Sequence, residues 1–306
     1  MRRGKGIKFG IIGAGSMGKN HARIASVLPG VVLAGVADIR KEAVEEVSNA
    51  YDLPPYNDFV DLLPNIEAVC VATPTQTHFE IGEKCLQAGK HLLIEKPFTG
   101  VPSLAQTLIN LAKERDLMLA VGLIERYNPA LLKLLKEIRG EKIIGVNIQR
   151  FSPFPERVAE TDVVLDMMLH DLDLLPLIIP EEITNIKAKG KKIKTELFDH
   201  VTATITFKSG AIAHVEANRV FSVRTRKIAV TTDKHMIEAD LLNKRIYVRD
   251  FSTPTPSTIP VKQTDQLTGE LNDFIAAIKS KGPRLESANR GLKALILAEE
   301  VKKACL

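Results

Sequence analysis

Two short groups of residues in this sequence have the types and spacing that proton transfer requires. The first is Glu95-Lys96-Pro97, which directly follows the apolar run His91–Ile94. Pro97 has a fixed φ angle and restricts the residue before it to extended geometry, which suits a lysine side chain that must be aimed. A lysine at a strand end is also an ordinary surface residue, and this segment alone does not decide between the two interpretations.

The second group lies in an apolar stretch from Val163 to about Ile178. Asp166 and His170 are four residues apart and Asp173 is three further on, so a helix places them on one face. A helix this apolar is buried, so its Asp and His must satisfy one another or line a cavity. They form either a core pair or a catalytic histidine tuned by carboxylates. The spacing also permits zinc, but no Cys or second His is nearby, and we expect no metal.

A glycine-rich segment near the start of the chain has the pattern of a dinucleotide-binding loop. Gly13-Ala14-Gly15-Ser16-Met17-Gly18 follows the apolar run Ile7–Ile12 and fits G-x-G-x-x-G. The first glycine permits a tight turn, the second lets a pyrophosphate approach the backbone, and the third lets helix and strand pack closely. The N-terminus of the following helix offers free N–H groups to the phosphates. The strand before it and the helix after it make the motif more specific than the glycines alone.

Asp38 ends the next apolar run, Val31–Ala37. A carboxylate about twenty residues after the glycines accepts hydrogen bonds from the adenosine ribose and repels a 2′-phosphate. It therefore favours NAD over NADP. Arg40 and Lys41 follow closely and could soften that preference.

The elements that must position these residues differ between the two halves of the chain. Up to about residue 125, short apolar runs alternate with helical stretches such as Thr77–Gln87 and Ser103–Arg115, which predicts a parallel sheet covered on both faces. The predicted strands are Ile7–Ile12, Val31–Ala37, Ala68–Ala72, His91–Ile94 and Met118–Val121. Ligands bind beyond the carboxyl ends of such strands, where Lys96 falls.

After residue 140 the runs are strand-like with few helices between them, which predicts a mostly antiparallel sheet. Lys208-Ser209-Gly210 is a candidate hairpin turn. The predicted strands are Lys142–Phe151, Ile183–Lys194, Val201–Phe207, Ala211–Ala217, Lys227–Thr232, Met236–Ala239 and Arg245–Val248; the predicted helices are Val163–Ile178, Gln266–Lys279 and Ser287–Ala304. We therefore expect an α/β protein with an N-terminal, doubly wound Rossmann domain (1–124) and a C-terminal α+β domain (125–306) with a large open sheet. The C-terminal helix can pack back on the first domain.

Composition limits the classes of function. The chain has 306 residues, 45% of them hydrophobic and 26% charged, with a net charge of +5. No run approaches the roughly 18 apolar residues of a membrane span, and the N-terminus does not read as a signal peptide. Basic residues are spread out and lack interleaved aromatics, which argues against nucleic-acid binding. Cys70, Cys85 and Cys305 show no C-x-x-C spacing and are typical of reduced packing residues. We expect a cytoplasmic protein.

Together these motifs resemble those of the Gfo/Idh/MocA oxidoreductases. The residues that carry the resemblance are the glycine loop, Asp38, Ala72-Thr73-Pro74-Thr75 with His78, Glu95-Lys96-Pro97, and Asp166 with His170, in this order. The resemblance covers essentially the whole chain. It implies an NAD-dependent dehydrogenase that acts on the CH–OH group of a sugar or polyol, and an oligomer, dimer or tetramer, formed through the open C-terminal sheet.

The resemblance also implies roles for individual residues. Lys96 and His170 match the family's catalytic pair, and Asp166 matches the supporting carboxylate. The implied cofactor-binding residues are Gly13, Gly15, Ser16, Met17, Gly18, Asp38, Ile39, Arg40, Ala72, Thr73, Pro74, Thr75, His78, Glu95 and Lys96.

One segment points to the kind of substrate. Residues 122–129, with Glu125-Arg126-Tyr127-Asn128-Pro129, are similar to the corresponding segment of UDP-N-acetylglucosamine 3-dehydrogenases, as is 151–157 more loosely. Arg126, Asn128, Arg150 and Arg157 are then candidates for substrate binding. The three arginines are candidates for holding a diphosphate, because guanidinium groups pair bidentately with phosphate oxygens. Ordinary salt-bridging arginines would look the same.

The sequence departs from the family pattern at one point, and other functions stay open. Many members have small residues between the Asp and the His, where this chain has Met167-Met168-Leu169, which bears on the shape of the substrate pocket. The alternatives are a non-catalytic NAD-binding sensor and a reductase of a non-sugar carbonyl compound.

Overall fold

The computed structural model describes residues 6–154, 161–253, 255–280, 282 and 284–305. The chain forms two compact units. The first comprises Met1–Leu123 with Leu267–Leu292, and the second Ile124–Gln266 with Lys293–Leu306. Among the described residues, no helix combines the length and apolar character needed to span a membrane.

The first unit contains a six-stranded sheet in the order β3-β2-β1-β4-β5-β6, with every neighbouring pair parallel. Its strands are β1 (Ile7–Ile12), β2 (Val31–Ala37), β3 (Pro55–Tyr56), β4 (Ala68–Val71), β5 (His91–Glu95) and β6 (Leu119–Gly122). The strand order reverses between β1 and β4. The carboxyl ends of these two strands are therefore the topological switch point at which such sheets bind ligands.

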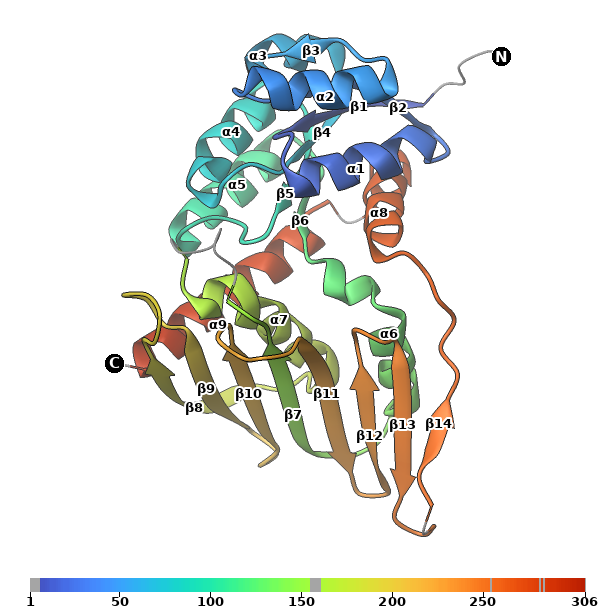
Figure 1. The fold of residues 1–306 in the computed structure, drawn as a ribbon, viewed down its shortest axis with the longest axis vertical. Helices are drawn as coiled ribbons and strands as arrows, with labels where there is room; N and C mark the ends of the chain where they lie inside the picture. Colours follow the sequence, from blue (N-terminus) through green and yellow to red (C-terminus); the bar gives the residue numbers. More distant parts are fainter. Residues whose placement is uncertain (1–5, 155–160, 254, 281, 283, 306) are drawn as a thin grey trace. The chain divides into compact units, whose positions relative to one another are not determined.

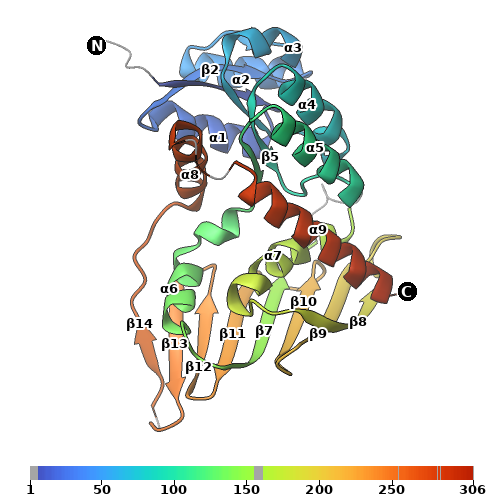
Figure 2. The ribbon, with the colours of Figure 1, turned by 180° about the vertical axis from the view of Figure 1, so that it is seen from behind.

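Helices cover both faces of this sheet because its strands are apolar on both sides (Figures 1 and 2). Phe9 and Ile11 on β1 and Val36 on β2 have no exposed surface. The helices of this unit are α1 (Ser16–Val27), α2 (Lys41–Tyr51), α3 (Phe59–Leu62), the 3₁₀ turn η1 (Leu63–Asn65), α4 (Thr75–Gln87), α5 (Pro102–Glu114), α8 (Gln266–Ser280) and the start of α9 (Glu286–Ala304).

Residues from the end of the chain complete the first unit. The ring of Phe274 on α8 packs edge-on against that of Phe9, with 6.4 Å between centroids. At β6, the Leu119 N–H donates to the carbonyl of Arg284 at 2.9 Å, and the Val121 N–H donates to Ser287 Oγ at 3.1 Å. Segment 267–292 is thus an integral part of the unit that contains the parallel sheet.

The second unit contains an eight-stranded sheet in the order β14-β13-β12-β11-β7-β10-β9-β8. It is antiparallel except where β10 runs parallel to β7. Its strands are β7 (Ile143–Phe151), β8 (Ile183–Lys191), β9 (His200–Phe207), β10 (Ile212–Asn218), β11 (Thr225–Thr232), β12 (His235–Asp240), β13 (Arg245–Asp250) and β14 (Ser257–Ile259). The predicted Lys208–Gly210 hairpin joins β9 to β10, with Gly210 at φ +87°.

The helices of the second unit lie on one face of its sheet, and the views from the two sides show the other face without helices in the described part of the unit (Figures 1 and 2). Strand β9 shows the resulting alternation, with Val201, Ala203 and Ile205 fully buried. The helices are the 3₁₀ turn η2 (Ile124–Tyr127), α6 (Pro129–Glu137), η4 (Val164–Met168), α7 (Leu169–Ile178) and the end of α9. The predicted fold class, a Rossmann sheet followed by a large, mostly antiparallel sheet, is confirmed.

Candidate active site

The glycine loop has the geometry that its spacing predicts. Gly13 has φ +100°, a conformation that side chains rarely adopt, and its N–H donates to the Ala37 carbonyl at 2.7 Å. A Cβ on Gly18 would lie 1.7 Å from the Gly13 carbonyl oxygen, so this position requires glycine for helix–strand contact. A Cβ on Gly15 would meet no atom within 4 Å. The space in front of Gly15 is therefore open to a ligand.

The N-terminus of α1 suits an anionic ligand. No side chain caps it and its first turn carries no acidic residue, so its N–H groups and the positive end of its dipole can face phosphate oxygens. Ser16 is exposed there and Met17 half-buried. This cradle fits the pyrophosphate of NAD.

Asp38 lies next to the glycine loop, at the carboxyl end of β2. Its carboxylate accepts hydrogen bonds from the N–H groups of Ala14 at 2.7 Å and Arg40 at 2.9 Å, and from the Arg40 guanidinium at 3.0 Å. Burial acts to raise the pKa of Asp38, but these hydrogen bonds outweigh it and hold the pKa below its ordinary value. Asp38 is thus an ionised acceptor suited to ribose hydroxyls. Ile39 beside it is 92% exposed, an apolar surface available to an adenine ring.

The loop after β4 and the corner after β5 are joined through His78. Its Nδ1 lies 2.9 Å from the Pro97 carbonyl oxygen and its Nε2 lies 2.9 Å from that of Thr73. His78 is 1% exposed, and burial lowers its pKa. Contact between His78 and the cofactor stays a prediction. The burial of His78 favours a structural role, in which its ring holds the two loops together. Ala72, Thr73 and Thr75 are half-buried and Pro74 is exposed.

Lys96 follows β5 at the carboxyl end of the sheet, as its position in the sequence predicts. The Lys96–Pro97 peptide bond is cis. The Lys96 N–H donates to Glu95 Oε2 at 3.2 Å, and Glu95 itself is buried. Lys96 is half-buried. It lies beyond the strand ends where an open α/β sheet binds its ligand.

Asp166 and His170 lie in the second unit, on the predicted helix. Its first turn, η4, is a π-helix, a wider turn that the sequence pattern did not indicate and that is frequent at functional sites. Asp166 and His170 are both half-buried, whereas residues 167–169 between them are buried. The two side chains are thus the accessible ones in the first half of this helix, among buried neighbours.

The two acidic residues of α7, Asp171 and Asp173, are committed to ion pairs. Asp173 accepts two hydrogen bonds from the Arg126 guanidinium. Asp171 pairs bidentately with Arg150 at 2.8–3.0 Å. Both carboxylates are buried. The sequence placed Asp173 on the face of His170, and the structure shows it paired with Arg126.

Arg150 is at the centre of a buried network. Its guanidinium also donates to Glu125 Oε1 at 3.0 Å, and Arg226 donates to the same oxygen at 2.9 Å. Only 3% of the Arg150 side chain is exposed. Asp171 and Glu125 keep the pKa of Arg150 above its ordinary value although burial acts to lower it. Direct binding of substrate by Arg150 stays a prediction, but this burial favours a structural role.

The remaining candidates for substrate binding differ in position. Asn128 is 1% exposed; it caps α6 by accepting from the Ala130 N–H at 3.0 Å and donates to the Leu241 carbonyl at 3.0 Å. These contacts favour a structural role for Asn128 as well. Arg126 is half-buried, beside Asp173. Arg157 lies outside the described residues.

Comparison with known proteins agrees with this architecture. Residues 7–123 match a model described as "Oxidoreductase family, NAD-binding Rossmann fold", and residues 145–238 match the GFO/IDH/MocA C-terminal domain. UDP-N-acetylglucosamine 3-dehydrogenase of Acidithiobacillus ferrooxidans is 33% identical over 97% of each chain. Its solved structure has a TM-score of 0.90, with coverage of 98% of this chain and 97% of that one.

Less similar proteins include an inositol dehydrogenase and a levoglucosan dehydrogenase. Myo-inositol 2-dehydrogenase of Thermotoga maritima is 26% identical, over 97% of this chain and 96% of that protein. A levoglucosan dehydrogenase solved with NADH and levoglucosan is 18% identical with a TM-score of 0.88 over 98% of this chain and 97% of that one, which shows the shared fold. The chain therefore belongs to the Gfo/Idh/MocA family and is an NAD-dependent oxidoreductase that acts on CH–OH groups.

Proposed function

We propose that this chain transfers hydride between NAD and a secondary hydroxyl of a nucleotide sugar, with C3 of UDP-N-acetylglucosamine as the first candidate. The observation that carries this proposal is the 33% identity to the Acidithiobacillus ferrooxidans enzyme over 97% of both chains. The inositol dehydrogenases support a free polyol as the second candidate, at lower identity.

In this proposal His170 and Lys96 act on the same substrate oxygen. NAD, when bound, supplies the site that accepts or returns hydride. His170 takes the hydroxyl proton, since an imidazole with an ordinary pKa of roughly 6.5 exchanges protons near neutral pH. Lys96 donates a hydrogen bond to that oxygen and stabilises the developing alkoxide. Asp166, which lies four residues before His170, orients the imidazole or binds a neighbouring hydroxyl.

A substrate panel tests the specificity. The purified protein is mixed with NAD⁺ and UDP-sugars, free hexoses or inositols, and NADH formation is followed by its near-ultraviolet absorbance. Turnover with a UDP-N-acetylhexosamine supports the nucleotide-sugar proposal. Turnover with free polyols alone contradicts it and leaves the roles of Lys96 and His170 in place. NADH binding without turnover on any substrate points to a sensor or to a non-sugar carbonyl substrate.

Replacement of Lys96 tests the mechanism. We expect Lys96→Met to reduce kcat at least about a hundredfold, the usual scale for a group that assists proton transfer. NADH binding, measured by the quenching or enhancement of nicotinamide fluorescence, should remain largely intact. Near-normal turnover in this variant would show that Lys96 has no part in the chemistry.

We further propose that the open face of the eight-stranded sheet forms a homodimer or homotetramer interface in the cytoplasm. The face contains a hollow of about 450 Å³ lined by residues of β7, β10, β11 and β12, with Ile212 40% exposed beside His214, Lys227 and Glu238. This mixed polarity fits a wet, partly charged interface. Sedimentation velocity at micromolar concentration is the test, and a monomer would refute the proposal.

A further inference from the structure

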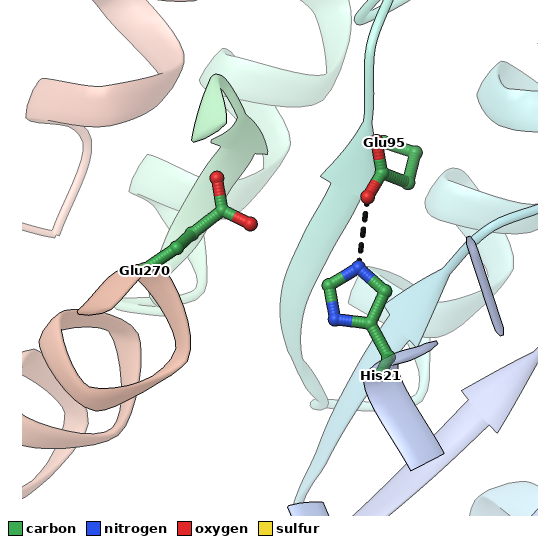
Figure 3. Close-up of side chains that lie close together, drawn as sticks. All are labelled: His21, Glu95 and Glu270. Carbon is green, nitrogen blue, oxygen red and sulfur yellow. Dashed lines mark hydrogen bonds and ion pairs between the residues drawn. The ribbon is translucent and has the colours of Figure 1, made fainter. Parts of the chain in front are cut away.

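Three titratable side chains meet in the interior of the first unit (Figure 3). They are His21 on α1, Glu95 on β5 and Glu270 on α8, which are 0%, 8% and 4% exposed. One nitrogen or oxygen atom from each lies within 4.8 Å of those from the others. Groups of this kind are costly to bury unless their charges are compensated.

Glu95 has partners for both of its oxygens, whereas Glu270 does not. Glu95 Oε1 lies 2.8 Å from His21 Nε2, and Oε2 accepts the Lys96 N–H at 3.2 Å. Neither carboxylate oxygen of Glu270 has a hydrogen-bond partner within the described parts of the chain. Figure 3 shows the Glu270 carboxyl group directed toward Glu95 and His21.

Two carboxylates at this separation in a buried site do not both stay ionised, so a proton or a cation must compensate one of them. A cation bound through His21 Nε2 and Glu95 Oε1 would have to separate these two atoms, which lie 2.8 Å apart. A proton on Glu270 displaces no existing contact. Burial raises the pKa of Glu270 well above its ordinary value, and the Glu95 charge acts in the same direction.

Two other titratable groups face this pair of carboxylates from neighbouring elements, Cys70 and His21. Cys70 on β4 is fully buried, and its thiol pKa is raised by burial and by the two carboxylates. The Nε2 atom of His21 on α1 contacts Glu95, and its Nδ1 atom has no hydrogen-bond partner in the described parts of the chain. Glu95 has a hydrogen-bond partner at each of its oxygens, so it is the carboxylate of the pair that is suited to stay ionised.

We infer that Glu270 is a positioning residue that carries a proton at neutral pH and leaves the charge of the cluster on Glu95, whose carboxylate fixes the backbone of Lys96. The positioning part of this inference rests on the proposed role of Lys96. The protonation of Glu270 does not, because it follows from the buried cluster alone.

The protonation is tested by the pH dependence of unfolding in urea, comparing the wild-type protein with Glu270→Gln between pH 6 and 9. Glutamate in an unfolded chain ionises near pH 4.3, so the wild-type protein would release this proton on unfolding. The pKa of Glu270 is raised in the folded protein. The folded state therefore loses stability relative to the unfolded chain as the pH rises from about 4.3 toward that raised pKa. We expect the unfolding constant of the wild-type protein to rise more steeply with pH than that of Glu270→Gln, by up to about tenfold per pH unit below the folded pKa of Glu270.

Glu125→Gln is the matched control, because Glu125 is equally buried but pairs with Arg150 and Arg226. These arginines hold the pKa of Glu125 below its ordinary value although burial acts to raise it. This variant should lose stability at every pH from 6 to 9 and keep the wild-type slope. A wild-type slope in Glu270→Gln would overturn the inference. Zinc or manganese in the purified protein, measured by mass spectrometry, would then identify a cation in the cluster.

The positioning role is tested by kinetics. Gln retains the shape and hydrogen-bonding capacity of a neutral Glu, so Glu270→Gln should keep kcat and its pH profile. Glu270→Leu should lower kcat about tenfold or more, with less change in KM, because the Lys96 corner loses its support. Normal turnover by Glu270→Leu would refute positioning even if the unfolding data show the proton. If the wild-type protein turns over no sugar, the unfolding comparison still tests the protonation.

Discussion

Replacement of Arg150 by Met tests whether this arginine holds the fold together or binds substrate. The change leaves Asp171, of which 1% of the side chain is exposed, without its bidentate partner. Glu125 keeps its hydrogen bond from Arg226. Removal of one member of a buried ion pair costs about 3–5 kcal/mol, because a buried charge remains uncompensated. For a protein of this size, this corresponds to a fall in Tm of roughly 5–8 °C.

Two further variants make this prediction specific. Arg226, with 45% of its side chain exposed, shares Glu125, so Arg226→Met should cost at most about 1 kcal/mol. The double variant Arg150→Met/Asp171→Leu should recover much of the lost stability, because apolar residues can replace a buried ion pair at little net cost.

The assay is urea unfolding followed by circular dichroism, together with KM for the sugar substrate. We expect a large loss of stability in Arg150→Met and little change in KM, measured at a temperature at which the variant is folded. A loss of stability below about 1 kcal/mol with a tenfold or larger rise in KM would refute this reasoning. Arg150 would then be the substrate ligand that its sequence position predicted.

Three other changes have expected outcomes. Gly18→Ala should abolish NAD binding or folding, because the new Cβ would lie 1.7 Å from the Gly13 carbonyl oxygen. Calorimetric titration with NADH measures the affinity, and a wild-type Kd would contradict this prediction. Asp38→Ala should raise the Kd for NADH and narrow its advantage over NADPH, as the ribose acceptor is lost; an unchanged Kd ratio would argue against that role. Three backbone N–H groups and Arg219 donate to Asp199. They hold the pKa of Asp199 well below its ordinary value, although burial acts to raise it. The ionised carboxylate therefore stabilises the folded protein above about pH 4, and this stabilisation is lost as the pH falls below that. Asp199→Asn should therefore be less stable at pH 7 and lose less on acidification to pH 3 in thermal unfolding scans, and parallel curves would contradict this.

Features that depend on local spacing could be predicted from the sequence. The turn at Gly13 and the contact at Gly18 follow from the backbone requirements of one strand–helix junction, and Asp38 follows from the end of the next strand. Lys96 lies beyond a strand end because the strand β5, with its apolar centre Leu92–Ile94, stops directly before it. Each of these positions is decided within a short stretch of chain.

Features that depend on which distant groups meet could not be predicted. The acidic residues of α7 look equivalent in the sequence, yet Asp171 and Asp173 are neutralised by Arg150 and Arg126, which come from other elements. The sequence pattern also gave no reason to place Glu270 beside Glu95, because more than half of the chain separates them. A sequence shows which residues carry charge, but tertiary packing determines which of them pair.

The division of the chain has a consequence for the order in which the protein can form during synthesis. The first unit contains Leu267–Leu292, and β6 hydrogen-bonds to Arg284 and Ser287. A ribosome makes these residues only after the whole of Ile124–Gln266, at about 5–20 residues per second. For many seconds the nascent Rossmann sheet therefore lacks α8, and the apolar surface around Phe9 is not covered by that helix. A chaperone that binds exposed apolar segments has its longest opportunity in that interval.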